Sequence, residues 1–248
     1  GTQECFIHQL KDMKEALPSY DYIGVGRDDG KEKGEHSAIF YRTDKFDVIE
    51  KGDFWLSETP DVPSKGWDAV LPRICSWGHF KCKDTGFEFL FFNLHMDHIG
   101  KKARVESAFL VQDKMKELGK GKELPAILTG DFNVDQTHQS YDAFVSKGVL
   151  CDSYEKAGFR YAINGTFNDF DPNSFTESRI DHIFVSPSFQ VKRYGVLTDT
   201  YRSIVGKGEK KQANDCPEEI DIKTYQARTP SDHFPVKVEL EFEQRQQK

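Results

Sequence analysis

Residues 125–133 read Pro-Ala-Ile-Leu-Thr-Gly-Asp-Phe-Asn, a short apolar run that leads into a polar turn. Such a run, bounded by Gly and Asp, is typical of a buried strand that ends in a turn. Asp131 and Asn133 are two residues apart, so in an extended or turn conformation their side chains point the same way. We therefore expect a buried strand that delivers a carboxylate and a carboxamide to one cleft, although Gly-Asp turns are also common without a function.

Four further segments place the same kinds of side chain at the ends of strand-like runs. Carboxylates, carboxamides and imidazoles delivered from several strand ends are what a metal-assisted phosphoryl-transfer site requires. Each segment alone has an ordinary structural explanation, so the argument rests on their combination and order. The segments are Gln3-Glu4, Asn93-Leu94-His95, Arg179-Ile180-Asp181-His182 and Ser231-Asp232-His233.

The histidines have competing interpretations. His233 precedes an alternating strand, where a single His is more often a capping or packing residue. A carboxylate partner, for which Asp181 is the natural candidate, would set its tautomer and raise its pKa. The cluster His95, Asp97 and His98 also resembles a transition-metal site, although no Cys or further His stands at ligand spacing.

Apolar periodicity and turn residues predict many strands and few helices. Helices are expected over 3–17, 101–118 and 140–147, with Glu4 in the opening turn of the first. Loops are expected over 27–35, 58–68, 168–178 and 205–230. We predict a single α/β domain over 1–248, with two sheets packed face to face and helices outside. The expected strands are 20–26, 37–42, 46–56, 73–82, 88–95, 125–129, 180–186, 190–197 and 234–242.

Composition limits the classes of function. The 248 residues include 20 Phe and are 37% apolar, enough for a sizeable core. The net charge of −7 provides no basic surface for non-specific nucleic-acid binding, although a bound divalent metal would reverse the sign inside an acidic cleft. Five cysteines without a CxxC pair predict neither a disulfide framework nor a zinc knuckle. No apolar run is long enough to span a membrane, so we expect a soluble monomer.

The order Gln-Glu, Asn-Leu-His, Gly-Asp-Phe-Asn, Arg-Ile-Asp-His and Ser-Asp-His-Phe-Pro-Val resembles the endonuclease/exonuclease/phosphatase family of metal-dependent phosphoesterases. The resemblance implies a four-layer α/β sandwich with two mostly antiparallel central sheets, helices outside, and the site at the sheet edge. It also implies a first strand that carries an Asn. Because the chain opens at Gly1, we expect that strand to precede residue 1. If an N-terminal segment has been removed, an extracytoplasmic location of the protein is also possible.

The resemblance also implies a role for each candidate site residue. A divalent metal, Mg²⁺ or Mn²⁺, is expected on Glu4 and Asp232. Asp131 and Asn133 are expected to orient the attacking water and the phosphate. Two histidines, each supported by a carboxylate, complete the expected catalytic group: His233 with Asp181, and His95 with Glu35. Arg73 is expected to contact the phosphate, together with Asn133 and His95.

We therefore predict a metal-dependent hydrolase of phosphoesters whose substrate is a small phosphorylated metabolite or sugar. A nuclease acting on DNA or RNA is the alternative, and a non-catalytic binding module is a third. Trp55, Trp67, Trp77 and Phe167 are candidates for stacking on a sugar ring, with core packing as the other explanation. The motifs of apurinic endonucleases and inositol 5-phosphatases do not fit, and residues 52–68 resemble an uncharacterised bacterial branch.

Overall fold

The computed structural model describes residues 1–119, 121–122, 124–161, 163–205 and 224–242. Its centre is a six-stranded sheet in the order β3-β4-β5-β6-β9-β7. Only β5 and β6 run parallel, and α2 (Lys101–Leu118) makes the crossover that a parallel pair needs. The strands are β3 (Phe46–Trp55), β4 (Ile74–Cys82), β5 (Glu88–His95), β6 (Ala126–Asp131), β9 (Asp181–Val185) and β7 (Cys151–Asp152).

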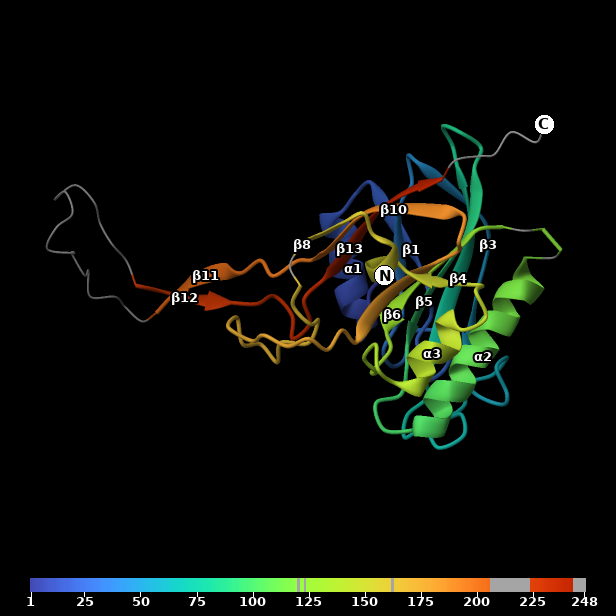
Figure 1. Ribbon diagram of the computed structural model, residues 1–248, viewed down its shortest axis with the longest axis horizontal. Coiled ribbons are helices and arrows are strands. Elements are labelled where there is room, and N and C mark those ends of the chain that lie inside the picture. The colour runs from blue at the N-terminus through green and yellow to red at the C-terminus, as the bar shows by residue number, and fades with distance from the viewer. Residues whose placement is uncertain (120, 123, 162, 206–223, 243–248) are drawn as a thin grey trace, which may run out of the picture.

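Two helices cover one face of this sheet (Figure 1). The helices are α2 and α3 (Gln139–Val145), and they pack against each other as well. Phe92 and Leu128 of the sheet form one core with Val111 and Phe144 of the helices, and all four are fully buried. Among the described residues, no helix is both long and apolar enough to cross a membrane.

The opposite face is covered by two smaller sheets. One has the order β13-β10-β8 and the other pairs β1 with β2. Phe80 and Val185 of the six-stranded sheet form a second core with Val196 and Phe234. The outer helix α1 (Ile7–Ala16) contacts β1 and buries Leu10. These strands are β1 (Tyr20–Ile23), β2 (Ile39–Arg42), β8 (Phe159–Tyr161), β10 (Phe189–Val196) and β13 (Val236–Phe242).

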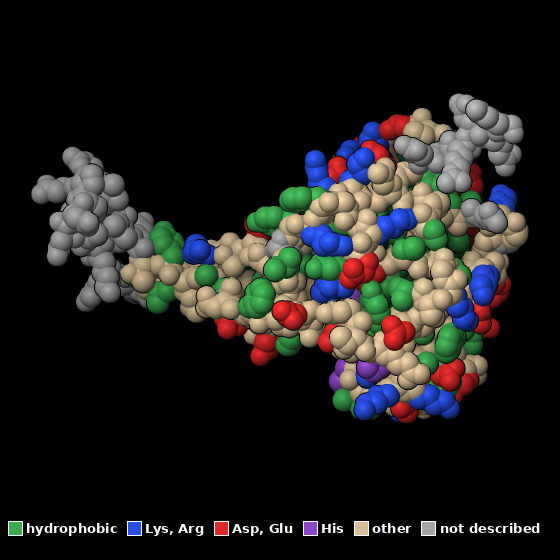
Figure 2. All heavy atoms as spheres, in the orientation of Figure 1, with side chains coloured by type: hydrophobic (Ala, Val, Ile, Leu, Met, Phe, Trp, Pro, Cys, Tyr) green, Lys and Arg blue, Asp and Glu red, His purple; other side chains and the backbone are tan. Residues whose placement is uncertain are grey.

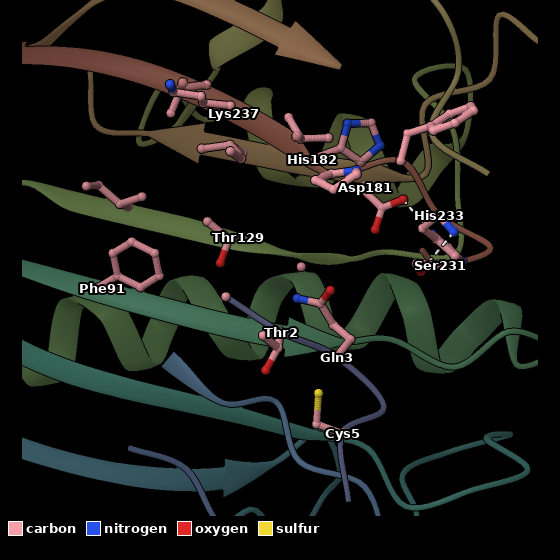
Figure 3. A pocket seen from close by; sticks show the side chains of 18 of the residues that line it. Thr2, Gln3, Cys5, Phe91, Thr129, Asp181, His182, Ser231, His233 and Lys237 are labelled. Atoms are coloured by element: carbon pink, nitrogen blue, oxygen red, sulfur yellow. Dashed lines mark hydrogen bonds and ion pairs between the residues drawn. The ribbon is translucent and has the colours of Figure 1, made fainter. Parts of the chain in front are cut away.

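The expected α/β fold with central sheets and outer helices is therefore confirmed, with the second sheet in two parts. A groove of about 720 Å³ lies between the N-terminal residues and β13, over β5, β6 and β9, and Figure 3 looks into it. Thr2 lies on one side of the groove and Lys237 of β13 on the other, while Asp181 and His233 lie at one end. The strand expected before residue 1 lies outside the sequence and stays a prediction.

The first helix begins later than expected. Instead of continuing the helix backward, the N-terminal residues run beside residues 36–38. The amide of Thr2 donates to the carbonyl of Ala38, and the amide of His36 donates to the carbonyl of Cys5, both at 2.9 Å. The prediction that Glu4 lies in the opening turn of the helix is wrong, because this tertiary pairing takes the backbone groups that the helix would use.

A hairpin of β11 (Tyr201–Ile204) and β12 (Tyr225–Arg228) projects from the body (Figure 1). The expected loop over 205–230 is wrong at 225–228, and residues 206–223 lie outside the described part of the chain. Four short elements were also not predicted, namely β7, β8, β11 and α4 (Ser153–Lys156). Each has four residues or fewer, too few to show a period. The expected bounds 88–95 and 101–118 match β5 and α2.

Candidate active site

Three strands end side by side at one edge of the six-stranded sheet. His95 is the last residue of β5, Asp131 the last of β6, and Asp181 the first of β9. The register pairs His95 with Asp131 and Asp131 with Asp181. Since paired residues on neighbouring strands point to the same face, the pairing brings these three side chains together.

The turn after β6 fixes the next residue of the site. A Cβ on Gly130 would lie 2.3 Å from the carbonyl oxygen of Leu94, so the close approach of β5 and β6 requires glycine. Beyond it, Asn133 has φ 51°, a left-handed conformation that Asn tolerates. The backbone N–H of Asn133 donates to Oδ1 of Asp131 at 2.8 Å, so the two residues predicted to act together are held in one turn.

The carboxamide of Asn133 sets the protonation of His95. Its Nδ2 donates to the carbonyl of Met96 at 2.9 Å and contacts Nε2 of His95 at 3.1 Å. An amide NH₂ only donates, so Nε2 accepts and the ring proton is on Nδ1. Burial, with the charges of Arg73 and Arg27, lowers the pKa of His95 well below its usual value. His95 is therefore a neutral imidazole.

Glu35, the expected support of His95, has a stronger partner. Its Oε2 is 3.9 Å from Nδ1 of His95, beyond hydrogen-bond distance. Arg27 instead binds both carboxylate oxygens, with NH1 to Oε2 at 2.6 Å and NH2 to Oε1 at 2.9 Å. Burial raises the pKa of Glu35, and the charge of Arg27 opposes that shift. Arg27 was not predicted, because a single Arg in a polar loop carries no sequence signal.

His233 and Asp181 form the expected pair. Nδ1 of His233 lies 2.7 Å from Oδ2 of Asp181, and the ring packs edge-on against Phe167 at 5.2 Å between centroids. Burial lowers the pKa of His233, but the hydrogen bond and charge of Asp181, with the charges of Asp131 and Asp232, raise it to about 9 overall. Near neutral pH this histidine is a cation.

Asp131 links the two histidines. Its Oδ2 lies 3.4 Å from Nε2 of His95. Burial and the charge of Asp181 raise the pKa of Asp131 to about 7, although the His233 cation opposes this shift. The two predicted histidines therefore lie near one buried carboxylate, although only His233 has its predicted partner.

Glu4 provides the exposed carboxylate of the site. Its φ of 61° is left-handed, and the paired backbone on either side holds it there. The preceding Gln3 donates to Oδ1 of Asn93 at 2.7 Å, which ties this segment to β5. The Glu4 side chain is 61% exposed, and its Oε1 lies 3.9 Å from Nε2 of His95.

The side chains beside Glu4 fit a divalent cation. One ligand atom each from Glu4, Glu35 and His95 lie within 4.8 Å of one another. Because Nδ1 of His95 carries the ring proton and Nε2 accepts from Asn133, the carboxylates of Glu4 and Glu35 are the ligands that this cluster offers to a metal. Carboxylate oxygens suit Mg²⁺ or Mn²⁺. Asp232, the other expected ligand, is not in this cluster, and its Oδ1 accepts from Ser231 at 3.4 Å.

Arg73 lies in the same part of the site. It is 4% exposed, with Nε 3.5 Å from Asp97 and NH2 2.9 Å from Nδ1 of His98, while its NH1 is buried without a partner. Asp97 accepts backbone amides, so among the described residues His95, Asp97 and His98 do not gather as a metal cluster. A cavity of about 240 Å³ is lined by Glu4, Arg27, Glu35, Leu71, Arg73, His95, His98 and Asn133.

The four aromatic candidates differ in their exposure. Trp55 and Trp77 are 5% and 8% exposed and belong to the core, so packing explains them. Trp67 is half-buried. Phe167 is 41% exposed beside His233, so it is the aromatic ring that can meet a substrate.

Other motif residues support the fold. Arg179 binds Asp152 at 3.2 Å and stacks on Tyr154 at 3.6 Å, and His182 contacts the carbonyl of Val134. The sequence did not single out Asn168 as a site candidate. In the structure its side chain is 1% exposed, and its Nδ2 has no hydrogen-bond partner.

A family model described as the endonuclease/exonuclease/phosphatase family matches residues 1–233. The chain belongs to this family, whose members are phosphoesterases.

Solved structures and a curated protein resemble the chain over most of its length. A mannosyl-6-phosphatase of Bacteroides thetaiotaomicron is 85% identical, with a TM-score of 0.89 over 98% of this chain and 84% of that one. A family protein of Bacteroides vulgatus is 38% identical, with a TM-score of 0.80 over 97% and 83% of the two chains. The uncharacterized protein L388 of Acanthamoeba polyphaga mimivirus is 31% identical over 96% of this chain and 84% of its own length.

Proposed function

We propose that this protein is a divalent-metal-dependent phosphatase that removes a terminal phosphate from a sugar. The observation that carries the proposal is the convergence of a charged His233, a buried Asp131 and the neutral His95 on one sheet edge. The 85% identical protein named as a mannosyl-6-phosphatase supports a mannosyl 6-phosphate as the substrate class.

Asp131 and Asn133 orient the water that attacks phosphorus. In its ionised form Asp131 accepts a proton from that water, and the raised pKa of about 7 keeps it basic enough to do so near neutral pH. Asn133 is fixed by its bonds to Asp131 and Met96, so its carboxamide is positioned before the substrate arrives.

His233 is the acid of the proposed reaction. Its ring is protonated below pH about 9 and is oriented by Asp181, so Nε2 can donate to the sugar oxygen as the P–O bond breaks. His95, kept neutral by burial, donates only from Nδ1. The two histidines therefore have different roles, with one a proton donor and the other part of the phosphate's surroundings.

A divalent cation held by Glu4, with Glu35 in the same cluster, would polarise the phosphoryl oxygens when it is bound, and Asp232 stays a further predicted ligand. The carboxylate of Glu4 is exposed enough to exchange water for a metal.

Sugar recognition is assigned to Phe167. An exposed aromatic ring beside the acid can stack on a sugar ring while the phosphate enters the site. Figure 2 shows Lys and Arg interspersed with Asp and Glu on the visible face of the body. Together with the net charge of −7, this favours a small substrate over a nucleic acid.

The test is phosphate release by the purified protein from mannose 6-phosphate, DNA and RNA, each with Mg²⁺, Mn²⁺ or EDTA. We expect metal-dependent release from the sugar phosphate and none with EDTA. Cleavage of nucleic acid in place of the sugar phosphate would establish the nuclease alternative. Metal-independent or absent activity on all three would overturn the proposal. We also propose that the protein acts as a monomer, which light scattering after gel filtration can measure.

A further inference from the structure

Two buried guanidinium groups line the 240 Å³ cavity beside His95, and only that of Arg73 was expected from the sequence to contact phosphate. Arg27 and Arg73 are 8% and 4% exposed. Nε of Arg27 and NH1 of Arg73 are buried without a hydrogen-bond partner. Each of the two cations keeps one buried donor unsatisfied, and both side chains line the same small cavity, so their charge and donors point to an anionic ligand there.

A third donor comes from His98, on the same cavity wall. Its Nδ1 contacts NH2 of Arg73 at 2.9 Å, and a guanidinium can only donate. Nδ1 of His98 therefore accepts, which leaves the proton on Nε2. The side chain is exposed, so this second N–H is free to meet a ligand.

Arg27 is held rigidly from three directions. Glu35 binds both of its terminal nitrogens, its own amide donates to the carbonyl of Glu35 at 3.0 Å, and its carbonyl accepts from Nε1 of Trp55 at 2.7 Å. A donor fixed in this way loses little entropy when a ligand binds.

We propose that Arg27, together with Arg73 and His98, forms a receptor for the terminal phosphate and makes the site selective for phosphomonoesters over phosphodiesters. A monoester presents three terminal oxygens and nearly two charges at neutral pH, whereas a diester presents two oxygens and one charge. A receptor with two guanidinium groups favours the more highly charged group with more acceptors. This inference deepens the proposed function and depends on it for the reaction.

The test compares two variants that differ only at Arg27. Glu35→Gln keeps Arg27, and Glu35→Gln with Arg27→Met removes its charge without stranding a buried carboxylate. Binding of inorganic phosphate is measured by calorimetry in EDTA, so that no metal contributes. The ratio of kcat/KM for p-nitrophenyl phosphate to that for bis(p-nitrophenyl) phosphate is measured with Mg²⁺. Arg193→Met, which removes an exposed arginine paired with Glu239, is the control.

We expect the double variant to bind phosphate at least roughly tenfold more weakly than Glu35→Gln, and its monoester preference to fall by a similar factor. Equal phosphate affinity, or equal loss on both esters, would overturn the inference while the proposed function stood. If the wild type cleaves neither ester but binds phosphate through Arg27, the proposed function fails and the receptor stands. If the double variant unfolds, Arg27→Lys is measured in its place. Phosphate affinity and monoester preference equal to those of the wild type would then contradict the need for a guanidinium.

Discussion

Nδ1 of His233 lies 2.7 Å from Oδ2 of Asp181, and this bond determines the charge of the proposed acid. Asp181→Asn should therefore lower the pKa of His233 from about 9 toward its ordinary value. NMR titration of the His233 ring in metal-free protein measures this directly. An unchanged titration near pH 9 in the variant would show that Asp181 is not the cause.

The same pair gives a pH dependence of stability. Since the folded pKa of His233 is raised, its contribution is complete below the unfolded value of 6.5 and is lost as pH rises through about 9. Asp181→Asn should cost at most about 3 kcal/mol near pH 6, and this cost should shrink above pH 9. Urea denaturation at several pH values checks the sign, and a cost that grows with pH would contradict it.

Gly130 is required by the close approach of two strands. Gly130→Ala would place a Cβ 2.3 Å from the carbonyl of Leu94 and displace the turn that holds Asp131. We expect a loss of about 2 kcal/mol or more in the free energy of unfolding, together with loss of phosphatase activity. Gly158→Ala is the matched control, because its Cβ would meet its nearest neighbour at 3.6 Å. Equal effects of the two substitutions would refute the steric explanation.

Glu4 is the predicted metal ligand. Glu4→Gln should weaken the apparent affinity for Mg²⁺ or Mn²⁺ by roughly tenfold or more, because an anionic oxygen is replaced by a neutral one. Calorimetric metal titration in the absence of substrate measures this effect. Glu15→Gln, an exposed position on α1, should leave the affinity unchanged. Identical metal binding in all three proteins would remove Glu4 from the metal site.

Phe167 is the proposed sugar platform. Phe167→Ala should raise KM for mannose 6-phosphate by roughly tenfold while inorganic phosphate still inhibits as before, because only the ring contact is lost. Phe109→Ala, which removes an exposed ring on α2, serves as the control. Weaker inhibition by phosphate in Phe167→Ala would show that the ring supports the phosphate site instead.

The strand ends of the site were predictable because periodicity and turn residues are local signals. His95, Asp131 and Asp181 each mark a strand end in the sequence, and the register brings them together. The sequence could not place Glu4 correctly, because the apolar period of the first helix extends backward from Leu10. Backbone pairing of the N-terminal residues with residues 36–38 prevents the helix from starting there. Such long-range hydrogen bonds cannot be predicted from a local sequence pattern.

The partner of Glu35 also could not be predicted. His95 was expected to take this carboxylate, but Arg27 binds both of its oxygens within an irregular loop. Loop conformation depends on tertiary contacts such as the bond from Trp55 to the carbonyl of Arg27. The same bond satisfies the indole N–H of the buried Trp55, whereas Phe167 is exposed beside the site.

The most direct test is metal-dependent phosphate release from mannose 6-phosphate by the wild type, Asp131→Asn and His233→Gln. Both variants should keep the fold, as judged by circular dichroism, and should lose at least about 100-fold in kcat. Arg193→Met should retain wild-type activity, since this side chain is exposed and paired with Glu239. Undiminished turnover in a folded Asp131→Asn or His233→Gln variant would contradict the assignment of this sheet edge as the active site.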